Sequence, residues 1–261
     1  MMSAVLRGSG EDRWPAPALL AAPATAEAYD VIGDVHGCLP ELLALLNQLG
    51  YRVDEALRVR APRGRHLVFA GDLVDRGVNT PGVLRLVMGA VQDGVASCVL
   101  GNHDDQLRRA LDGETLPSTR GRAAALDQLA RETPAFRAQV RAFLGGLPPR
   151  LRLAGGRLLV AHAGDRDTLG EEARSRSNVY GLSLPERDAF GRRLRDDWVA
   201  AYRGSALVAY GHTPVRTPQW RGRTVNLDTG CAFGGALSAL RFPEGLTASV
   251  AARSGVRYGR P

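Results

Sequence analysis

The stretch Tyr29-Asp30-Val31-Ile32-Gly33-Asp34-Val35-His36-Gly37 contains a unit that recurs along the chain: a short apolar run followed by glycine and polar residues. A short apolar run that ends at glycine is typical of a strand buried on both faces. Four more such runs occur, at 66–70 before Gly71-Asp72, 96–100 before Gly101-Asn102-His103-Asp104, 158–161 before His162-Ala163-Gly164, and 207–210 before Gly211-His212-Thr213. The sequence therefore predicts five buried strands, each followed by a polar group.

Helical patterns lie between these runs. Residues 39–49 have apolar helical spacing, with Pro40 in the first turn and Gly50 just past the end, and 81–91, 104–111 and 135–144 are similar. Strands that alternate with helices indicate a layered α/β domain. The last stretch differs: 224–227, 236–241 and 246–251 read as consecutive strands, which predicts an antiparallel edge or a second sheet.

The sequence pattern also predicts the local structure of regions outside these strands and helices. Residues 112–150 are mostly helical in pattern and could form a cap beside a site, while 165–195 are charged and weakly periodic, which predicts a loop-rich segment. Residues 1–27 include an Ala- and Pro-rich stretch preceded by acidic residues, which favours a disordered leader over a signal peptide. No apolar run is long enough to span a membrane, so no membrane partner is expected.

Composition narrows the functional classes. The chain has 261 residues and a net charge of +7, and every basic residue is Arg. Without Lys it cannot contain a GxxxxGK[ST] phosphate loop, which excludes a kinase built on that loop. One interpretation is that the Arg-only surface attracts phosphates, RNA or acidic peptides. The alternative is that the Arg residues are simply scattered over a solvated surface. Cys38, Cys98 and Cys231 form no CxxC pair, which favours a reducing, cytoplasmic setting and buried thiols.

The polar residues after the strands form a set with metal-binding chemistry. Ligands of α/β proteins bind at the carboxyl ends of strands, and four of the five histidines lie there. The set combines carboxylates, imidazoles and one amide: Asp34, His36, Asp72, Asn102, His162 and His212. Oxygen and nitrogen donors without thiolate favour Mn²⁺, Fe, Mg²⁺ or Zn²⁺. Because a carboxylate can bridge two cations, and two cations about 3.5–4 Å apart can activate a water, a dinuclear centre is predicted.

Three blocks carry a family resemblance. Residues 33–37 (GDVHG), 71–77 (GDLVDRG) and 101–104 (GNHD) resemble the signature blocks of calcineurin-like metallophosphoesterases. They look most like the branch of Ser/Thr phosphoprotein phosphatases and symmetrical diadenosine tetraphosphatases. Residues 162–164, 211–214 and 226–231 are similar to bacterial members, and the last also to the phosphatase module of RNA-end-healing enzymes. The resemblance implies a two-sheet β-sandwich flanked by helices, in a domain over 28–255 with a helical insertion at about 112–150 and a tail at 256–261.

The resemblance also implies residue roles. Asp34 and His36 would hold the first metal, Asp72 would bridge both, and Asn102, His162 and His212 would complete the second. Two divalent ions are expected, Mn first and Fe, Zn, Ni or Mg as alternatives. Arg76 would contact the phosphate through its planar fork together with Asn102, and His103 would protonate the leaving oxygen, held by Asp75. An alternative is that Asp75 and Arg76 only pair with each other. The family's second phosphate-binding Arg has no clean match; Arg174 and Arg176 are candidates.

These observations predict a dinuclear metal-dependent phosphoesterase that hydrolyses phosphate monoesters in the manner of a protein phosphatase. Alternatives are a bis(5'-nucleosyl)-tetraphosphate hydrolase, an RNA-end 2',3'-phosphatase and, from another class, a metal-free basic RNA-binding module. The partner would be a phosphorylated substrate: a phosphoprotein, a nucleotide or an RNA end. Its identity depends on the cap and the loop region and not on the motifs, and the oligomeric state is left open.

Overall fold

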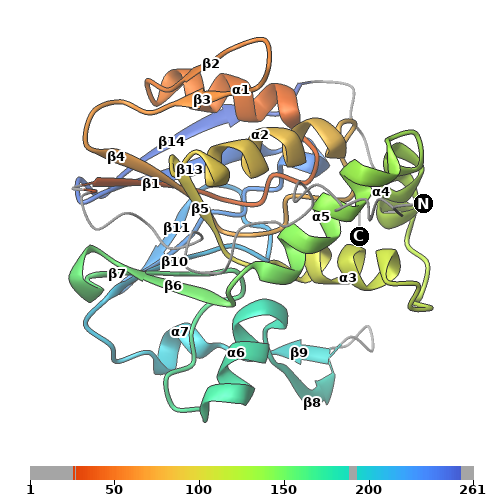
Figure 1. Ribbon diagram of the computed structural model, residues 1–261. Coiled ribbons are helices and arrows are strands. Elements are labelled where there is room, and N and C mark those ends of the chain that lie inside the picture. Colours follow the sequence, from red (N-terminus) through yellow and green to blue (C-terminus); the bar gives the residue numbers. More distant parts are fainter. Residues whose placement is uncertain (1–25, 27, 188–192, 254–261) are drawn as a thin grey trace, which may run out of the picture.

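Two five-stranded sheets form the centre of the protein (Figure 1). The computed structural model describes Ala26, residues 28–187 and residues 193–253, so the predicted leader, apart from Ala26, and the predicted tail lie outside the described residues. The first sheet has the order β14-β13-β1-β4-β5. Its strands are β1 (Ala28–Ile32), β4 (Arg65–Phe69), β5 (Ala96–Cys98), β13 (Ala236–Phe242) and β14 (Leu246–Ala251). β1, β4 and β5 are parallel, and β13 and β14 form an antiparallel edge.

The second sheet has the order β11-β12-β10-β7-β6. Its strands are β6 (Arg150–Leu153), β7 (Leu158–Ala161), β10 (Leu207–Tyr210), β11 (Gln219–Arg221) and β12 (Thr224–Asn226). β7, β10 and β12 are parallel, while β6 and β11 pair antiparallel at the two edges. The three strands expected near the C-terminus are thus divided: β12 joins this sheet, and β13 and β14 complete the first.

The core between the sheets is apolar and follows the alternation of the strands. Val31 and Val68 of the first sheet pack with Val160, Ala209 and Val225 of the second, all fully buried. The opposite face of the first sheet packs against helices. This arrangement confirms the predicted sandwich, because each central strand buries both of its faces.

One buried carboxylate links three neighbouring strands in the middle of the first sheet. Asp30 of β1 is fully buried and accepts hydrogen bonds from Arg65 Nε at 2.7 Å and from Arg241 Nε at 3.1 Å. Tyr51 donates its hydroxyl to the same carboxylate at 2.9 Å. Since Arg65 lies on β4 and Arg241 on β13, Asp30 ties β1 to both neighbouring strands.

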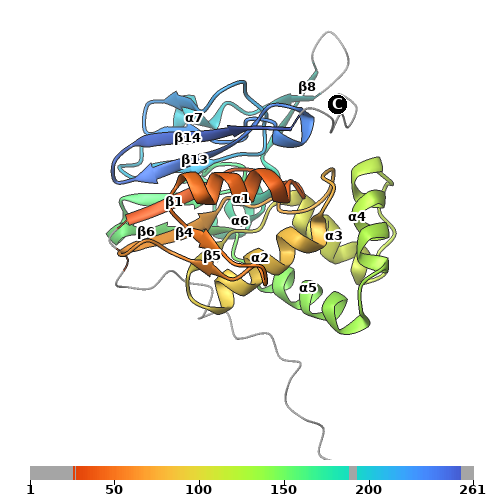
Figure 2. The ribbon, with the colours of Figure 1, turned by 90° about the horizontal axis from the view of Figure 1, so that it is seen from above.

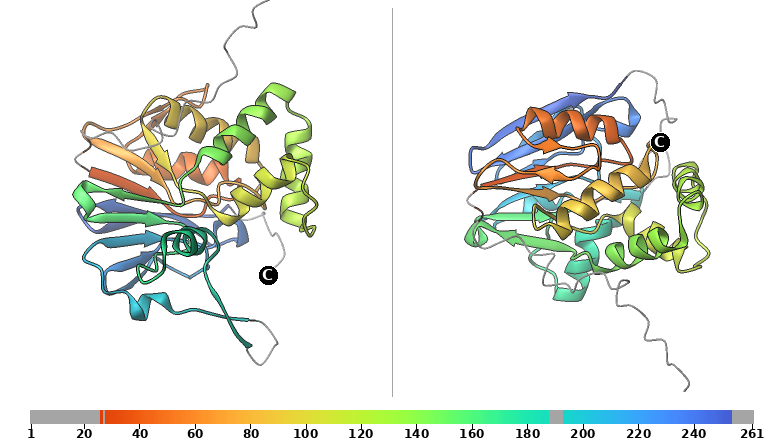
Figure 3. Two further views of the ribbon diagram at one scale, coloured as in Figure 1. Left: turned by 60° about the horizontal axis from the view of Figure 1, so that its bottom comes forward. Right: turned by 45° about the horizontal axis from the view of Figure 1, so that its top comes forward.

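Helices flank the sandwich on both sides (Figure 2). α1 (Leu39–Gln48) and α2 (Thr80–Gln92) cover the first sheet, and α6 (Glu171–Tyr180) and α7 (Trp198–Ala201) lie beside the second. α3 (Asn102–Leu111), α4 (Arg120–Ala130) and α5 (Pro134–Gly146) gather at one end of the molecule in both views of Figure 3. Other short elements are β2 (Arg52–Val53), β3 (Val59–Arg60), and the 3₁₀ turns Ala154–Gly156 and Cys231–Phe233. Among the described residues, no helix combines the length and apolarity needed to cross a membrane.

The expectation of a loop-rich segment over 165–195 was wrong. The segment contains α6 and a hairpin of β8 (Ser183–Arg187) and β9 (Arg193–Arg195). α6 escaped the periodicity argument because its first turns are exposed and only its last turn is buried. Polar contacts hold it instead: Arg174 donates to Asp165 at 2.7 Å, and Asn178 donates to Gly164 O at 2.7 Å. Such contacts leave no apolar repeat in a sequence.

Candidate metal centre and phosphate site

The loops after five strands converge at one end of the sandwich and carry the six predicted metal ligands. Asp72, which follows β4, lies between two histidines: its Oδ2 is 3.5 Å from His36 Nε2 and 3.4 Å from His162 Nε2. Asp34 joins this group, since ligand atoms of Asp34, Asp72 and His162 all lie within 4.8 Å of one another. The structure thus brings four of the six residues into one buried cluster.

The remaining two residues adjoin the same cluster. Asn102 Oδ1 is 3.0 Å from His162 Nε2 and 2.8 Å from His212 Nδ1, and the two ring nitrogens are 3.2 Å apart. The backbone N–H of His212 donates to Asp34 Oδ2 at 3.2 Å, which joins the loop after β10 to the loop after β1. All six side chains predicted to bind metal therefore share one site.

Backbone carbonyls behind the two histidines decide which nitrogen each ring turns toward Asp72. His36 Nδ1 is 2.7 Å from Val74 O, and His162 Nδ1 is 3.0 Å from Ala70 O. A carbonyl only accepts, so each Nδ1 carries the proton and each Nε2 presents a lone pair to the carboxylate. The lone pair of His162 faces the Asp72 carboxylate at 3.4 Å, an arrangement that is repulsive unless a cation lies between the two groups. The donor set therefore fits a divalent metal.

The charge states agree with this interpretation. Burial lowers the pKa of His36 to about 3 and lowers the pKa of His162 as well, so both rings are neutral at pH 7. Neutral imidazole is the form that binds metal. Burial together with the charges of Asp228 and Asp72 raises the pKa of Asp34. Carboxylates crowded in this way are stabilised in their charged form by a cation.

The backbone around the centre is held in unusual conformations. Of seven described non-glycine residues with positive φ, five lie here: His36, Asp72, Asp75, Arg76 and His212, with φ between 45° and 71°. Each such residue costs on the order of 1–3 kcal/mol, and this strain concentrates where function requires a fixed side-chain direction.

Two glycines leave room for the ligands. A Cβ at position 101 would lie 2.3 Å from Asp72 Oδ1, and one at position 211 would lie 1.9 Å from Asp34 Oδ1. Gly101 and Gly211 are therefore required by the close approach of backbone to carboxylate.

The predicted acid and its partner lie beside the metal cluster. His103 Nδ1 donates to Asp75 Oδ2 at 2.6 Å, and Asp75 is fully buried. Burial lowers the pKa of His103, but the charge of Asp72 and the hydrogen bond to Asp75 more than offset this, so the pKa is raised overall. The Asp72 charge and the hydrogen bond to Asp75 therefore favour the cationic form of His103.

Arg76 lies across the same site. Its Nη2 donates to His103 Nε2 at 2.8 Å, its Nη1 contacts His36 Nε2, and its guanidinium lies over the Phe233 ring, 4.9 Å from the centroid. Asp75 and Arg76 thus interact with histidines, which answers the alternative that they only pair with each other. A forked cation at the edge of a metal cluster is well placed for a phosphate.

Helix α4 supports the loop that carries Asp75 and Arg76. The Gln128 side chain accepts a hydrogen bond from Thr80 N at 2.7 Å and donates to Gly77 O at 3.0 Å. Arg76 N donates to Gly121 O at 3.4 Å. The helical region over 112–150 therefore holds this loop in place through Gln128 and Gly121. Sequence reasoning missed Gln128, because nothing local marks a helical glutamine as a partner of a distant loop.

Two more buried carboxylates belong to the site and were not assigned a role. Asp104 accepts from Leu73 N at 2.9 Å and Gly101 N at 3.1 Å, which joins the second and third signature blocks. Burial and the charge of Asp72 raise its pKa to about 7. Asp228 is also buried, and burial raises its pKa to about 6. Both lie in segments quoted for the resemblance, which was the available signal.

The two candidates for a second phosphate-binding arginine lie away from the centre. Arg174 is committed to the buried carboxylate of Asp165, with its Nε 2.7 Å from Oδ1 and a second contact to Oδ2. Arg176 is exposed on α6. The structure does not bring either of them to the metal cluster.

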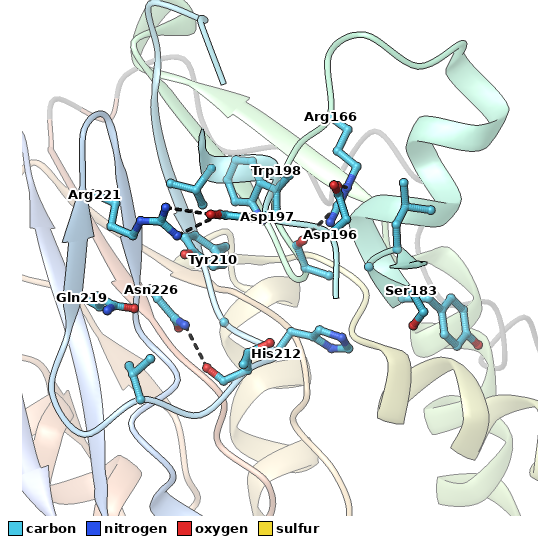
Figure 4. A pocket seen from close by; sticks show the side chains of 18 of the residues that line it. Arg166, Ser183, Asp196, Asp197, Trp198, Tyr210, His212, Gln219, Arg221 and Asn226 are labelled. Atoms are coloured by element: carbon cyan, nitrogen blue, oxygen red, sulfur yellow. Dashed lines mark hydrogen bonds and ion pairs between the residues drawn. The ribbon is translucent and has the colours of Figure 1, made fainter. Parts of the chain in front are cut away.

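A pocket of about 370 Å³ opens beside the centre and shares Asn102 and His212 with it. We call it the side pocket, and Figure 4 shows its walls: Gln219 and Arg221 of β11 on one side and Ser183 of β8 on the other. Two ion pairs lie in the walls, Arg166–Asp196 at 2.6 Å and Arg221–Asp197 at 2.8 Å. Its other lining residues are Ala163, Tyr180, Gly181, Leu182, Trp198, Val199, Tyr210, Gly211, Thr213, Val215 and Asn226.

The sequence model of the calcineurin-like phosphoesterases matches residues 29–238, and the chain belongs to this family. It is a metal-dependent hydrolase of phosphoric esters, in agreement with its cluster of metal-binding side chains. The family expected from the three signature blocks is thereby confirmed.

The chain is similar over most of its length to two named relatives. The chain is 43% identical over 230 residues to the asymmetrical bis(5'-nucleosyl)-tetraphosphatase PrpE of Bacillus subtilis (strain 168), covering 85% of this chain and 94% of that protein. It is 40% identical to the same enzyme of Geobacillus thermodenitrificans (strain NG80-2), covering 85% and 93%.

Solved structures agree on the fold. A crystal structure described as that of "a putative diadenosine tetraphosphatase" superposes with a TM-score of 0.67 at 27% identity, covering 89% of this chain and 97% of that chain. A protein serine/threonine phosphatase of Saccharomyces cerevisiae shares the fold with a TM-score of 0.58 at 13% identity, covering 91% and 82%.

Proposed function

We propose that this protein hydrolyses bis(5'-nucleosyl) tetraphosphates at a dinuclear centre that takes Mn²⁺. The observation that carries the proposal is the continuity of the metal cluster with the side pocket, which share Asn102 and His212. A substrate bound with its phosphate at the cluster can therefore extend a nucleoside into a pocket. The names of the Bacillus and Geobacillus relatives support this substrate class.

The residues of the centre divide into ligands and groups that act on the substrate. Asp34 and His36 would hold one ion, Asn102, His162 and His212 the other, and Asp72 would lie between them, because its Oδ2 faces both His36 and His162. When bound, two divalent cations supply a nucleophilic water at neutral pH and offset the charge of the phosphate.

Arg76 and Asn102 would orient the phosphate. In this structure the Arg76 guanidinium contacts the lone pairs of His36 and His103. A phosphate offers it two anionic oxygens, which match the planar fork better than two imidazoles do. Its release from His103 Nε2 leaves that nitrogen free to carry a proton.

His103 would then donate the Nε2 proton to the leaving oxygen. Asp75 accepts from Nδ1 at 2.6 Å, which fixes the ring and stabilises its cationic form. The leaving group of a nucleotide anhydride is itself a charged phosphate chain. Protonation by His103 would lower the charge that develops on it.

A substrate panel tests the proposal with the Mn²⁺-loaded protein: diadenosine tetraphosphate, a phosphopeptide, an aryl phosphate and a 2',3'-cyclic nucleotide. We expect the highest kcat/KM for the tetraphosphate. The motifs alone favoured a protein-phosphatase substrate, and a preference for the phosphopeptide would restore that interpretation. Preference for the cyclic nucleotide would favour RNA-end processing.

The products of tetraphosphate hydrolysis show which phosphoanhydride bond is cleaved. Asymmetrical cleavage, as in the names of the relatives, gives a nucleoside triphosphate and a monophosphate, whereas symmetrical cleavage gives two diphosphates. Chromatography of the first products separates the two cleavage patterns.

Failure to take up Mn²⁺ in metal analysis would instead support the metal-free RNA-binding alternative.

A further inference from the structure

The charged side chains of the side pocket neutralise one another. Arg166 donates to Asp196 Oδ2, and Arg221 donates to both oxygens of Asp197 at 2.8 and 2.9 Å. The two arginines and two aspartates among the lining residues therefore sum to no net charge. A site for another phosphate group would present uncompensated arginine, as Arg76 does at the cluster. The side pocket is thus unsuited to an anion.

The inner wall of the pocket is aromatic. Trp198 of α7 packs edge-on against Tyr210 of β10, with ring centroids 5.0 Å apart, and both are largely buried. Trp198 is fixed by Gly164, where a Cβ would lie 2.1 Å from the indole. Leu182 and Val215 extend this apolar lining. Such a rigid wall is complementary to a flat, uncharged ring system.

The outer wall supplies an amide that can bind the edge of a ring. Gln219 and Arg221 of β11 line the pocket, whereas Trp220 between them does not, because successive strand residues point to opposite faces. Gln219 is exposed and has both a donor and an acceptor on its side chain. A nucleobase presents the complementary pattern of donors and acceptors.

The loop that carries His212 is fixed where the pocket meets the metal cluster. Asn226 Nδ2 donates to Thr213 O at 2.8 Å, and Asn226 Oδ1 accepts from Asp228 N at 2.9 Å. Figure 4 shows His212 at this junction, between the walls that bear Gln219 and Ser183. A ligand in the pocket therefore has a fixed position relative to the reacting phosphate.

We infer that the side pocket binds the nucleoside of the substrate, with the base against the Trp198 wall and its edge at Gln219. The inference rests on the proposed function, since it names the part of a nucleotide substrate that this pocket takes. The volume of about 370 Å³ lies at the lower end of ligand pockets and suits one nucleoside.

Two substitutions on the same edge strand test it. Gln219→Trp adds bulk on the pocket face of β11, and Trp220→Gln, its matched control, changes the opposite face at a position that is 43% exposed. Gln219→Ala removes only the amide. For each Mn²⁺-loaded protein, kcat/KM is measured with diadenosine tetraphosphate and with an aryl phosphate, and calorimetry measures the binding of adenosine and of inorganic phosphate.

We expect Gln219→Trp to lower the ratio of kcat/KM for the tetraphosphate to that for the aryl phosphate about tenfold or more, with an equal weakening of adenosine binding. Gln219→Ala should lower the same ratio about 2- to 10-fold, the range of one lost hydrogen bond. Trp220→Gln should leave the ratio and adenosine binding unchanged, and inorganic phosphate should bind all variants alike.

Several results would overturn the inference: no adenosine binding to the unaltered protein, equal effects of Gln219→Trp and Trp220→Gln, or weakened phosphate binding in Gln219→Trp. Failure of the proposed function is a separate outcome, recognised when the unaltered protein does not hydrolyse the tetraphosphate. Adenosine binding that is lost in Gln219→Trp would then still support a nucleoside pocket, in an enzyme with a different nucleotide substrate.

Discussion

The metal cluster and the side pocket share two residues, yet they are built differently. The cluster consists of buried side chains on short loops directly after strands, several with a left-handed backbone. The pocket is lined mainly by residues within 163–183 and 196–226, with an exposed Arg221–Asp197 ion pair and an edge strand. Strand-end loops fix chemistry because the sheet holds them, whereas exposed walls can change without disturbing it. Catalysis should therefore depend on the first region and substrate choice on the second.

Removal of the metal is expected to have the largest effect on hydrolysis, and this effect should be the same for every substrate. Exhaustive chelation should abolish hydrolysis of every substrate alike, because the proposed mechanism uses the same centre for the nucleotide and for the aryl phosphate. Added Mn²⁺ should restore activity. The measurement is turnover against metal content. Full activity after complete metal removal would contradict the assignment of Asp34, His36, Asp72, Asn102, His162 and His212.

His103→Ala should separate substrates by their leaving groups. A general acid contributes about 10²–10⁴ in rate, so turnover of an alkyl monoester with a basic leaving oxygen should fall by that factor. An aryl phosphate, whose leaving oxygen needs little protonation, should lose much less. Steady-state kinetics on both substrates is the test. Equal losses would make His103 a positioning residue.

Arg76→Lys should weaken phosphate binding although the charge is kept. Lysine offers a point charge where arginine offers a planar fork, so inhibition by inorganic phosphate should weaken about tenfold. Arg131→Lys is a matched control at an exposed position. If both variants bound phosphate like the unaltered protein, Arg76 would have no place in the phosphate site.

Asp165→Asn should lower the stability of the fold and change the pH dependence of that stability. Its effect on the hydrolysis of an aryl phosphate should be the smallest of the effects predicted here. Burial raises the pKa of Asp165, but hydrogen bonds from Arg174 and Asn178 more than offset this, so the pKa is lowered overall. The carboxylate therefore stabilises the fold above its unfolded pKa of about 3.9, and this contribution is lost as pH falls through the folded value.

We expect the substitution to lower the free energy of unfolding by about 1–3 kcal/mol at neutral pH. The stability loss between about pH 4 and more acidic conditions should become smaller in the variant. Denaturant titrations across pH measure both. Asp167→Asn, at an exposed neighbouring position, is the control. An unchanged free energy of unfolding would show that the Asp165–Arg174 pair contributes nothing to the fold.

The same contrast explains what could be predicted from the sequence. The runs at 29–32, 66–70, 158–161 and 207–210 each pair an apolar strand with polar residues at its end, and proximity then follows from parallel pairing. The position of α6 could not be predicted, because Asp165, Arg174 and Asn178 hold it through polar contacts without periodicity. The side pocket likewise needs β11, α7 and the hairpin of β8 and β9 in place, a matter of tertiary packing.

The hydrogen bonds by which Asp30 links β1 to both neighbouring strands have a consequence for folding during synthesis. Asp30 and Arg241 are 211 positions apart in the sequence, so β1 leaves the ribosome long before its partner strand β13. Until then one edge of β1 is an open template for foreign strands. The loop with Asp34 and His36 thus waits for β13, and the nascent protein can gain its metal-binding capacity only after Arg241 has been synthesised.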